Sequence, residues 1–134
     1  MYLVDTNVLS ELLRPRPSAD VVRWLQSQTA VALSVITVEE LAYGVARAPA
    51  PKRAKLAQWL DGLLESAVHT FEVTEAIAKA AGELRAARER GGRRVAQADM
   101  LTAATALVHG LTLATRNARD FVDCGIAIVD PFSR

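Results

Sequence analysis

The sequence lacks the features of several common enzyme classes. Cys124 is the only cysteine, which rules out an internal disulfide and fits a reducing compartment such as the cytoplasm. With no cysteine pair and no ligand spacing between His69 and His109, a zinc site is disfavoured. Gly91-Gly92 matches no phosphate-binding glycine loop, and no G-x-S-x-G elbow is present. These absences leave chemistry based on carboxylates.

Long apolar runs are also missing. Asp5 interrupts the N-terminal apolar segment after four residues, which argues against a signal peptide. Met100–Thr115, the longest uncharged stretch in the final third of the chain, has 16 residues and is too short and polar to span a bilayer. We therefore expect a cytoplasmic protein with no membrane segment. The net charge of +1 leaves room only for a local nucleic-acid-binding patch.

What the sequence does contain is a regular alternation of apolar patterns. Its 134 residues are 51% hydrophobic, which predicts one globular domain over residues 1–134. The predicted strands are Tyr2–Val4, Val31–Leu33, Val68–Val73, Leu111–Thr115 and Ile126–Val129. The predicted helices are Asp5–Leu13, Ser18–Gln28, Thr37–Arg47, Lys52–Ser66, Thr74–Arg90 and Val95–His109. Strands separated by helices indicate an α/β fold with a mostly parallel sheet and helices on both faces.

Two acids in the first third of the chain have both a functional and a structural interpretation. Asp5 follows the first predicted strand, where open α/β sheets place ligands. It would serve equally well as a helix N-cap, accepting a hydrogen bond from the amide of Asn7 or Val8. Glu40 fits a capping box with Thr37, so the local pattern alone favours a structural role for it.

Asp99 is harder to explain as a structural residue. Its neighbours on the same helical face include no cation: they are Val95, Ala96, Thr102 and Ala103. A buried carboxylate on that face needs a partner from elsewhere, and a divalent metal ion is one such partner. The alternative is that Asp99 lies in the first helical turn and benefits from the helix dipole.

A polar cluster follows the fourth predicted strand and contains Asn117 and Asp120. Together with Asp5, Glu40 and Asp99, these side chains supply the oxygen ligands that Mg²⁺ or Mn²⁺ prefers. Arginines gather beside two of these acids. Arg93 and Arg94 precede Asp99, and Arg116 precedes Asn117, so they are candidates for gripping RNA phosphates, although a solvated helix end explains them as well.

Four motifs stand in a fixed order along the chain: Leu3-Val4-Asp5-Thr6-Asn7-Val8-Leu9-Ser10-Glu11, Ser34-Val35-Ile36-Thr37-Val38-Glu39-Glu40-Leu41, Ala96-Gln97-Ala98-Asp99-Met100 and Ala114-Thr115-Arg116-Asn117-Ala118-Arg119-Asp120-Phe121. In this order they resemble the PIN-domain ribonucleases, and within them the VapC/FitB-type toxins of bacterial toxin–antitoxin pairs. The resemblance spans essentially the whole chain.

The resemblance implies a three-layer α/β/α PIN-like fold and RNA cleavage that depends on Mg²⁺, with Mn²⁺ as a substitute. Asp5 and Asp99 match the metal ligands of the family, and Glu40 matches its glutamate because it directly precedes Leu41. Asn117 stands where the family often has an acid, and another acid follows at Asp120, so either side chain could complete the metal shell. All five are candidate catalytic residues.

The resemblance also implies partners. Toxins of this type form homodimers and are neutralised by a small VapB-like antitoxin, which would place an Arg or Lys near the acids. The helices that carry Trp24, Tyr43 and Trp59 offer large apolar side chains for the core or for such a partner.

Two alternatives to a nuclease stay open. The chain could be a catalytically inactive PIN-like module that binds RNA or protein. It could also be an aspartate-dependent phosphatase, although that chemistry generally needs a second Asp two residues after the first, where Asn7 stands.

Overall fold

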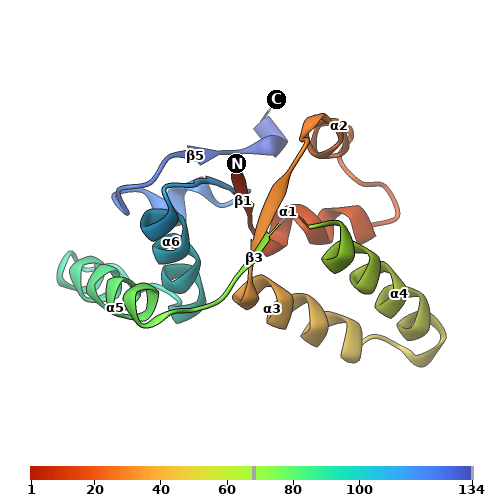
Figure 1. Cartoon of the computed structure of the whole chain (residues 1–134), viewed down its shortest axis with the longest axis horizontal. Coiled ribbons are helices and arrows are strands. Elements are labelled where there is room, and N and C mark those ends of the chain that lie inside the picture. Colours follow the sequence, from red (N-terminus) through yellow and green to blue (C-terminus); the bar gives the residue numbers. More distant parts are fainter. Residues whose placement is uncertain (68, 134) are drawn as a thin grey trace.

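The protein contains one five-stranded parallel sheet, seen in a computed structural model that describes residues 1–67 and 69–133 (Figure 1). The strand order is β3-β2-β1-β4-β5. The strands are β1 (Tyr2–Val4), β2 (Val31–Ser34), β3 (His69–Phe71), β4 (Thr112–Ala114) and β5 (Ile128–Val129). The α-helices are α1 (Thr6–Ser10), α2 (Ala19–Ser27), α3 (Val35–Ala46), α4 (Ala50–Ser66), α5 (Glu75–Arg90) and α6 (Gln97–His109). Short 3₁₀ helices are η1 (Glu11–Leu13), η2 (Ala118–Phe121) and η3 (Pro131–Ser133).

The central strands are buried on both faces, which is why their sequences are continuously apolar. Successive side chains of β1 point to opposite faces of the sheet, so Leu3 and Val4 belong to two different cores. The core around Leu3 is formed with α5 and α6, and the core around Val4 with α1, α2, α3 and α4. Figure 1 shows these two sets of helices on opposite sides of the sheet, so the predicted three-layer α/β/α arrangement is confirmed.

The sheet order explains why the candidate residues meet. The chain builds outward from β1 through β2 to β3, and then returns to place β4 on the other side of β1. The carboxyl ends of β1 and β4 therefore lie side by side at the point where the order reverses, the usual ligand site of open parallel sheets. The amide of Asp5 joins the two ends by donating to the carbonyl oxygen of Ala114 at 2.9 Å.

Most of the predicted elements are present with small shifts at their ends. Ser18 and Thr74 cap α2 and α5 as expected, and Gly110 ends α6 in the left-handed conformation with φ of 64°. The predicted helix Asp5–Leu13 is divided into α1 and η1. The predicted strand Val68–Val73 is observed as β3, and Val68 lies outside the described residues.

One local prediction is wrong. The helix expected to start after Thr37 begins at Val35, because the Ser34 hydroxyl accepts a hydrogen bond from the Ile36 amide at 3.0 Å and caps the helix there. Thr37 is instead buried inside the helix, and its hydroxyl has no hydrogen-bond partner among the described residues. Glu40 therefore belongs to no capping box, and its carboxylate is free for another role.

In the described part of the chain, no helix combines the length and apolar character that crossing a bilayer requires.

Because Ser34, and not Thr37, caps α3, we expect two substitutions to have opposite effects on stability. Ser34→Ala removes the observed cap and should lower the free energy of unfolding by about 1 kcal/mol. Thr37→Val removes a buried hydroxyl that lacks a partner, so it should leave stability unchanged or raise it. Urea unfolding of both variants measures the difference. The reverse ranking would restore the capping box of Thr37 and Glu40.

Candidate active site

Asp5 is buried at the end of β1 and is fixed from three sides. Its Oδ1 accepts from the Thr6 amide at 2.8 Å, and its Oδ2 accepts from the Thr115 hydroxyl at 2.9 Å and from Asn7 Nδ2 at 3.3 Å. Asp5 is thus the N-cap of α1, although its donor is Thr6 and not the predicted Asn7 or Val8 amide. The cap uses only the Oδ1 oxygen of Asp5, so capping α1 does not exclude a functional role for the same carboxylate.

The environment of Asp5 disfavours its charged form. Burial raises the pKa of Asp5 above its usual range, the hydrogen bonds from Thr115 and Thr6 lower it in part, and the charge of Glu40 raises it again. A buried carboxylate with such opposing influences on its pKa is typical of a functional site.

Glu40 is brought to Asp5 by Thr6. The Thr6 hydroxyl donates to Glu40 Oε1 at 2.6 Å, while the Thr6 amide donates to Asp5. One residue therefore ties the end of β1 to the exposed face of α3. The contact orients the Glu40 carboxylate and leaves it accessible to solvent.

Asp99 lies in the first turn of α6, as the dipole interpretation requires. Burial, followed by the charges of Asp5, Asp120 and Glu40 in that order, raises the pKa of Asp99 from 3.8 to about 6. The four acids are therefore electrostatic neighbours, although they come from four separate segments of the chain.

The residues that align this cluster were not predicted from the sequence. Thr115 is completely buried, and its hydroxyl donates to Asp5 while accepting from Asn7 Nδ2 at 3.3 Å and from the Asn117 amide at 3.1 Å. The Asn7 side chain also accepts from the Arg116 amide at 3.1 Å. The available signal was a polar residue closing each apolar strand at the same edge of the sheet.

The two candidates after β4 differ in their surroundings. Asp120, on η2, shares a pocket of about 140 Å³ with Asp99, and its charge acts on that residue. Asn117 contributes its backbone to the network, through the amide that donates to Thr115 and the carbonyl that accepts from Asp120. Its side chain makes no cap for η2. Asp120 is thus the better placed of the two to act with Asp99.

The donor set suits a hard divalent cation. All the donors are oxygens, and burial together with repulsion from the other acids raises the pKa of Asp99, so an added cation would relieve an unfavourable charge balance. Among the residues that the structure describes, no three His, Cys, Asp or Glu side chains already form a ready-made metal cluster. An ion held by one or two carboxylates that keeps several of its waters, as Mg²⁺ does, fits this arrangement.

The three predicted RNA-binding arginines border the acids. Arg93 and Arg94 line the same pocket as Asp99 and Asp120. Arg116 lines a neighbouring pocket of about 310 Å³ with Asn117 and Asp120, and its guanidinium carbon lies 4.6 Å from the centre of the Phe132 ring. Their role in RNA binding stays a prediction, and their position beside the acids is compatible with it.

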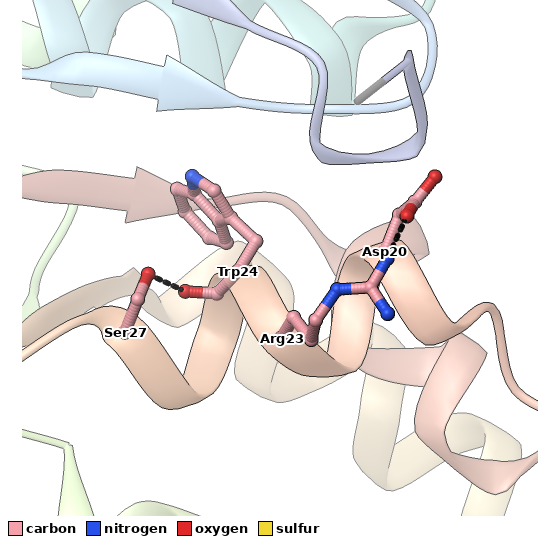
Figure 2. A pocket seen from close by; sticks show the side chains of 4 residues that line it. All are labelled: Asp20, Arg23, Trp24 and Ser27. Carbon is pink, nitrogen blue, oxygen red and sulfur yellow. Dashed lines mark hydrogen bonds and ion pairs between the residues drawn. The ribbon is translucent and has the colours of Figure 1, made fainter.

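A pocket of about 370 Å³ on α2 is lined by Asp20, Arg23, Trp24 and Ser27 (Figure 2). Arg23 is ion-paired with Asp20, and the Ser27 hydroxyl donates to the backbone carbonyl of Trp24 at 2.6 Å. These polar groups satisfy one another, and none belongs to the acid cluster, so we assign this pocket no catalytic role.

Comparison with known proteins agrees with the geometry. The family model described as "PIN domain" matches residues 2–125. Toxin FitB of Neisseria gonorrhoeae is 38% identical over 98% of this chain and 99% of its own. VapC ribonuclease Y4jK of Sinorhizobium fredii is 35% identical over 98% of both chains. The tRNA(fMet)-specific endonuclease VapC of Shigella flexneri is 30% identical over 92% of both.

Solved structures are also similar to this chain. The crystal structure of FitAcB from Neisseria gonorrhoeae superposes with a TM-score of 0.94 and 37% identity over the full length of both chains. DNA-bound VapBC from Salmonella typhimurium superposes with a TM-score of 0.81 and 25% identity over 97% of both.

The burial of Asp99 and its repulsion by the other acids predict how stability depends on pH. Folding raises the pKa of Asp99 from 3.8 to about 6, so its ionised form is destabilising in the folded chain. This penalty is absent below about pH 4 and complete above about pH 6. In EDTA at pH 7.5, Asp99→Asn should therefore raise the free energy of unfolding by about 1 kcal/mol, allowing for solvent screening at a half-buried side chain.

At pH 3.5 the gain should vanish, because Asp99 is then protonated in both states. Asp61→Asn, at an exposed position of α4, is the matched control and should change little at either pH. Urea unfolding at the two pH values checks this, and a gain that is equal at both would contradict the assignment.

Proposed function

Since the chain belongs to the PIN-domain family, as a ribonuclease toxin of the VapC/FitB type, we propose that it hydrolyses RNA phosphodiester bonds at the acid cluster around Asp5. The main supporting observation is that Asp5, Glu40, Asp99 and Asp120 come from separate segments of the chain, yet the charge of Glu40 acts on Asp5 and the charges of the other three acids act on Asp99. An inactive binding module would have no need for such mutually repelling acids, so their presence supports an enzyme.

The proposed cofactor is Mg²⁺, with Mn²⁺ as a substitute, held by Asp5 and Asp99 with help from Glu40. PIN nucleases are typically metal-dependent, and the oxygen donors of this chain suit such an ion. When bound, a divalent ion lowers the pKa of water and offsets the charge of the scissile phosphate.

The protein's part in the reaction is positioning. Thr115 and Thr6 hold the two carboxylate oxygens of Asp5 in fixed directions, so this ligand does not reorganise when substrate arrives. The exposed Glu40 carboxylate, steadied by the Thr6 hydroxyl, can accept a proton from the attacking water. Asp120 is the proposed fourth acid, while Asn117 keeps the loop after β4 in place.

The substrate side of the site is basic. Arg93, Arg94 and Arg116 border the acids and are proposed to contact RNA phosphates, because guanidinium groups bind phosphate in a bidentate manner. The relative from Shigella flexneri is named as specific for tRNA(fMet), which makes that transfer RNA the first substrate to test. Residues 1–134 are proposed to act as one PIN domain in the cytoplasm.

A VapB-like antitoxin and a second copy of the chain are the proposed protein partners. The Klebsiella pneumoniae relative was solved as a toxin–antitoxin complex, which supports the first. Of the three large aromatics considered, Trp24 is buried against Tyr2 and Trp59 is partly buried in the core around Val4. Tyr43 on α3 is 62% exposed and is the one most available to a partner. An Arg or Lys of the antitoxin would occupy the acid cluster and block RNA.

Loss of a metal-binding carboxylate should abolish activity without unfolding the protein. We expect Asp5→Ala to reduce RNA cleavage by more than about 100-fold, since even residues that only orient metal ligands typically contribute 10- to 100-fold. Cleavage of a labelled RNA at saturating Mn²⁺ and circular dichroism of the variant measure the two effects. Near-normal cleavage by a folded Asp5→Ala protein would refute the assignment and favour an inactive binding module.

Glu40 and its neighbour Glu39 provide a matched comparison. Both are exposed on α3, but only Glu40 contacts Thr6. Glu40→Gln preserves a hydrogen-bond acceptor and removes the charge, so it should cut kcat by about 10- to 100-fold with little change in stability. Glu39→Gln should leave kcat unchanged. Equal rates for the two variants would remove Glu40 from the site.

A further inference from the structure

Arg88 is a buried cation that the proposed reaction does not use. Only 6% of its surface is exposed, although it lies near the end of α5. Its Nη1 donates to the Val122 carbonyl and to Cys124 Sγ, the latter at 3.5 Å. Its Nε and Nη2 are buried without an acceptor among the described residues. A buried guanidinium in this state is costly unless a further negative group completes its surroundings.

Arg88 lines the pocket of about 140 Å³ that also holds Asp99 and Asp120. Two more arginines line this pocket, so three cations face two acids. None of the three arginines has a carboxylate within ion-pair distance in the described part of the chain. The pocket is therefore lined by acids on one part and by arginines on another, and among the described residues no direct ion pair neutralises the charge of the arginines.

The turn after α5 explains how Arg93 and Arg94 reach Arg88. Gly92 takes a φ of +83°, a left-handed conformation that L side chains rarely adopt, and reverses the chain. The Arg93 amide then donates to the Arg88 carbonyl at 3.0 Å. A second contact, from Arg93 Nη2 to the Arg119 carbonyl at 3.1 Å, holds this arginine over the loop after β4.

The amino end of α6 adds a further positive influence. Its N-cap is Ala96, which lines the pocket and has no side chain able to accept from the first-turn amides. In this 13-residue helix, those amides carry the positive end of the dipole and suit an anion. Asp99 lies on the same turn but belongs to the acid cluster. Its negative charge would repel a bound anion toward Arg88, Arg93 and Arg94.

We propose that Arg88, Arg93 and Arg94, with the amino end of α6, form a subsite for a phosphate group of the substrate. Because Asp99 and Asp120 border the same pocket, the bound group is the phosphate next to the scissile one, and not the scissile phosphate itself. The identity of that ligand as RNA rests on the proposed function, whereas the affinity for phosphate rests on the arginines.

Thermal unfolding in EDTA with inorganic phosphate, at ionic strength held constant with chloride, tests the subsite without any cleavage. Phosphate at about ten times its dissociation constant should raise the Tm of the wild-type protein by roughly 4–8 °C. Arg88→Met, which keeps an apolar stem in the core, should lose most of this increase. Arg94→Ala changes an exposed side chain, should fold normally and should lose at least half of it.

Arg90→Ala is the matched control, because Arg90 is an exposed arginine at the same helix end outside the pocket. It should retain the full phosphate-dependent increase. If Arg88→Met does not fold, Arg94→Ala against Arg90→Ala decides the question. No increase in the wild-type protein, or equal increases in those two variants, would overturn the subsite.

A neutral methylphosphonate linkage beside the scissile bond tests the position. It should lower kcat/KM of the wild-type enzyme by about tenfold and that of the Arg94→Ala enzyme by a clearly smaller factor, because part of the contact is already lost. Equal losses in both would place the phosphate elsewhere and overturn the inference. If no RNA is cleaved at all, the proposed function fails, and the phosphate titration still judges the subsite by itself.

Discussion

The hydrogen bond between the Thr115 hydroxyl and the Asp5 carboxylate, 2.9 Å long and completely buried on the threonine side, is the contact on which the site depends. It joins the carboxyl ends of the two central strands, β1 and β4, and fixes the direction of the deepest acid. Thr6 connects this point to α3, because its hydroxyl donates to Glu40. Asn7 connects it to the loop after β4, because its side chain accepts from the Arg116 amide. The tripeptide after β1 thus supplies one acid and two alignment residues.

Opposite charges are kept apart within a small volume. Burial and the charges of neighbouring acids raise the pKa values of Asp5 and Asp99, while the nearby arginines form no ion pairs with the acids in the described part of the chain. If these groups were paired directly, the acids would be less available to a cation and the arginines to phosphate. The left-handed turn at Gly92 and the burial of Arg88 hold the arginines in place, so that they stay unpaired with the acids.

The sequence predicted the features that depend on near neighbours. Ser18, Thr74 and Gly110 were identifiable as helix ends because their partners lie within a few residues. Asp99 was identifiable because its own helical face contains no cation. The capping box at Thr37 failed because Ser34 offered a competing cap, and Glu40 is held instead by Thr6, 34 residues away. The burial of Arg88 was equally hidden, since the loop that covers it also lies 34 residues away.

The order of β1 and β4 in the sheet has a consequence for synthesis. β1 is synthesised long before β4, yet the hydroxyl that aligns Asp5 belongs to Thr115, and β4 must pair with β1 to deliver it. A nascent chain that ends before this point lacks a complete site, however well its first helices have folded. Alignment of Asp5 is therefore a late event in synthesis, because it waits for β4 to be made and paired with β1.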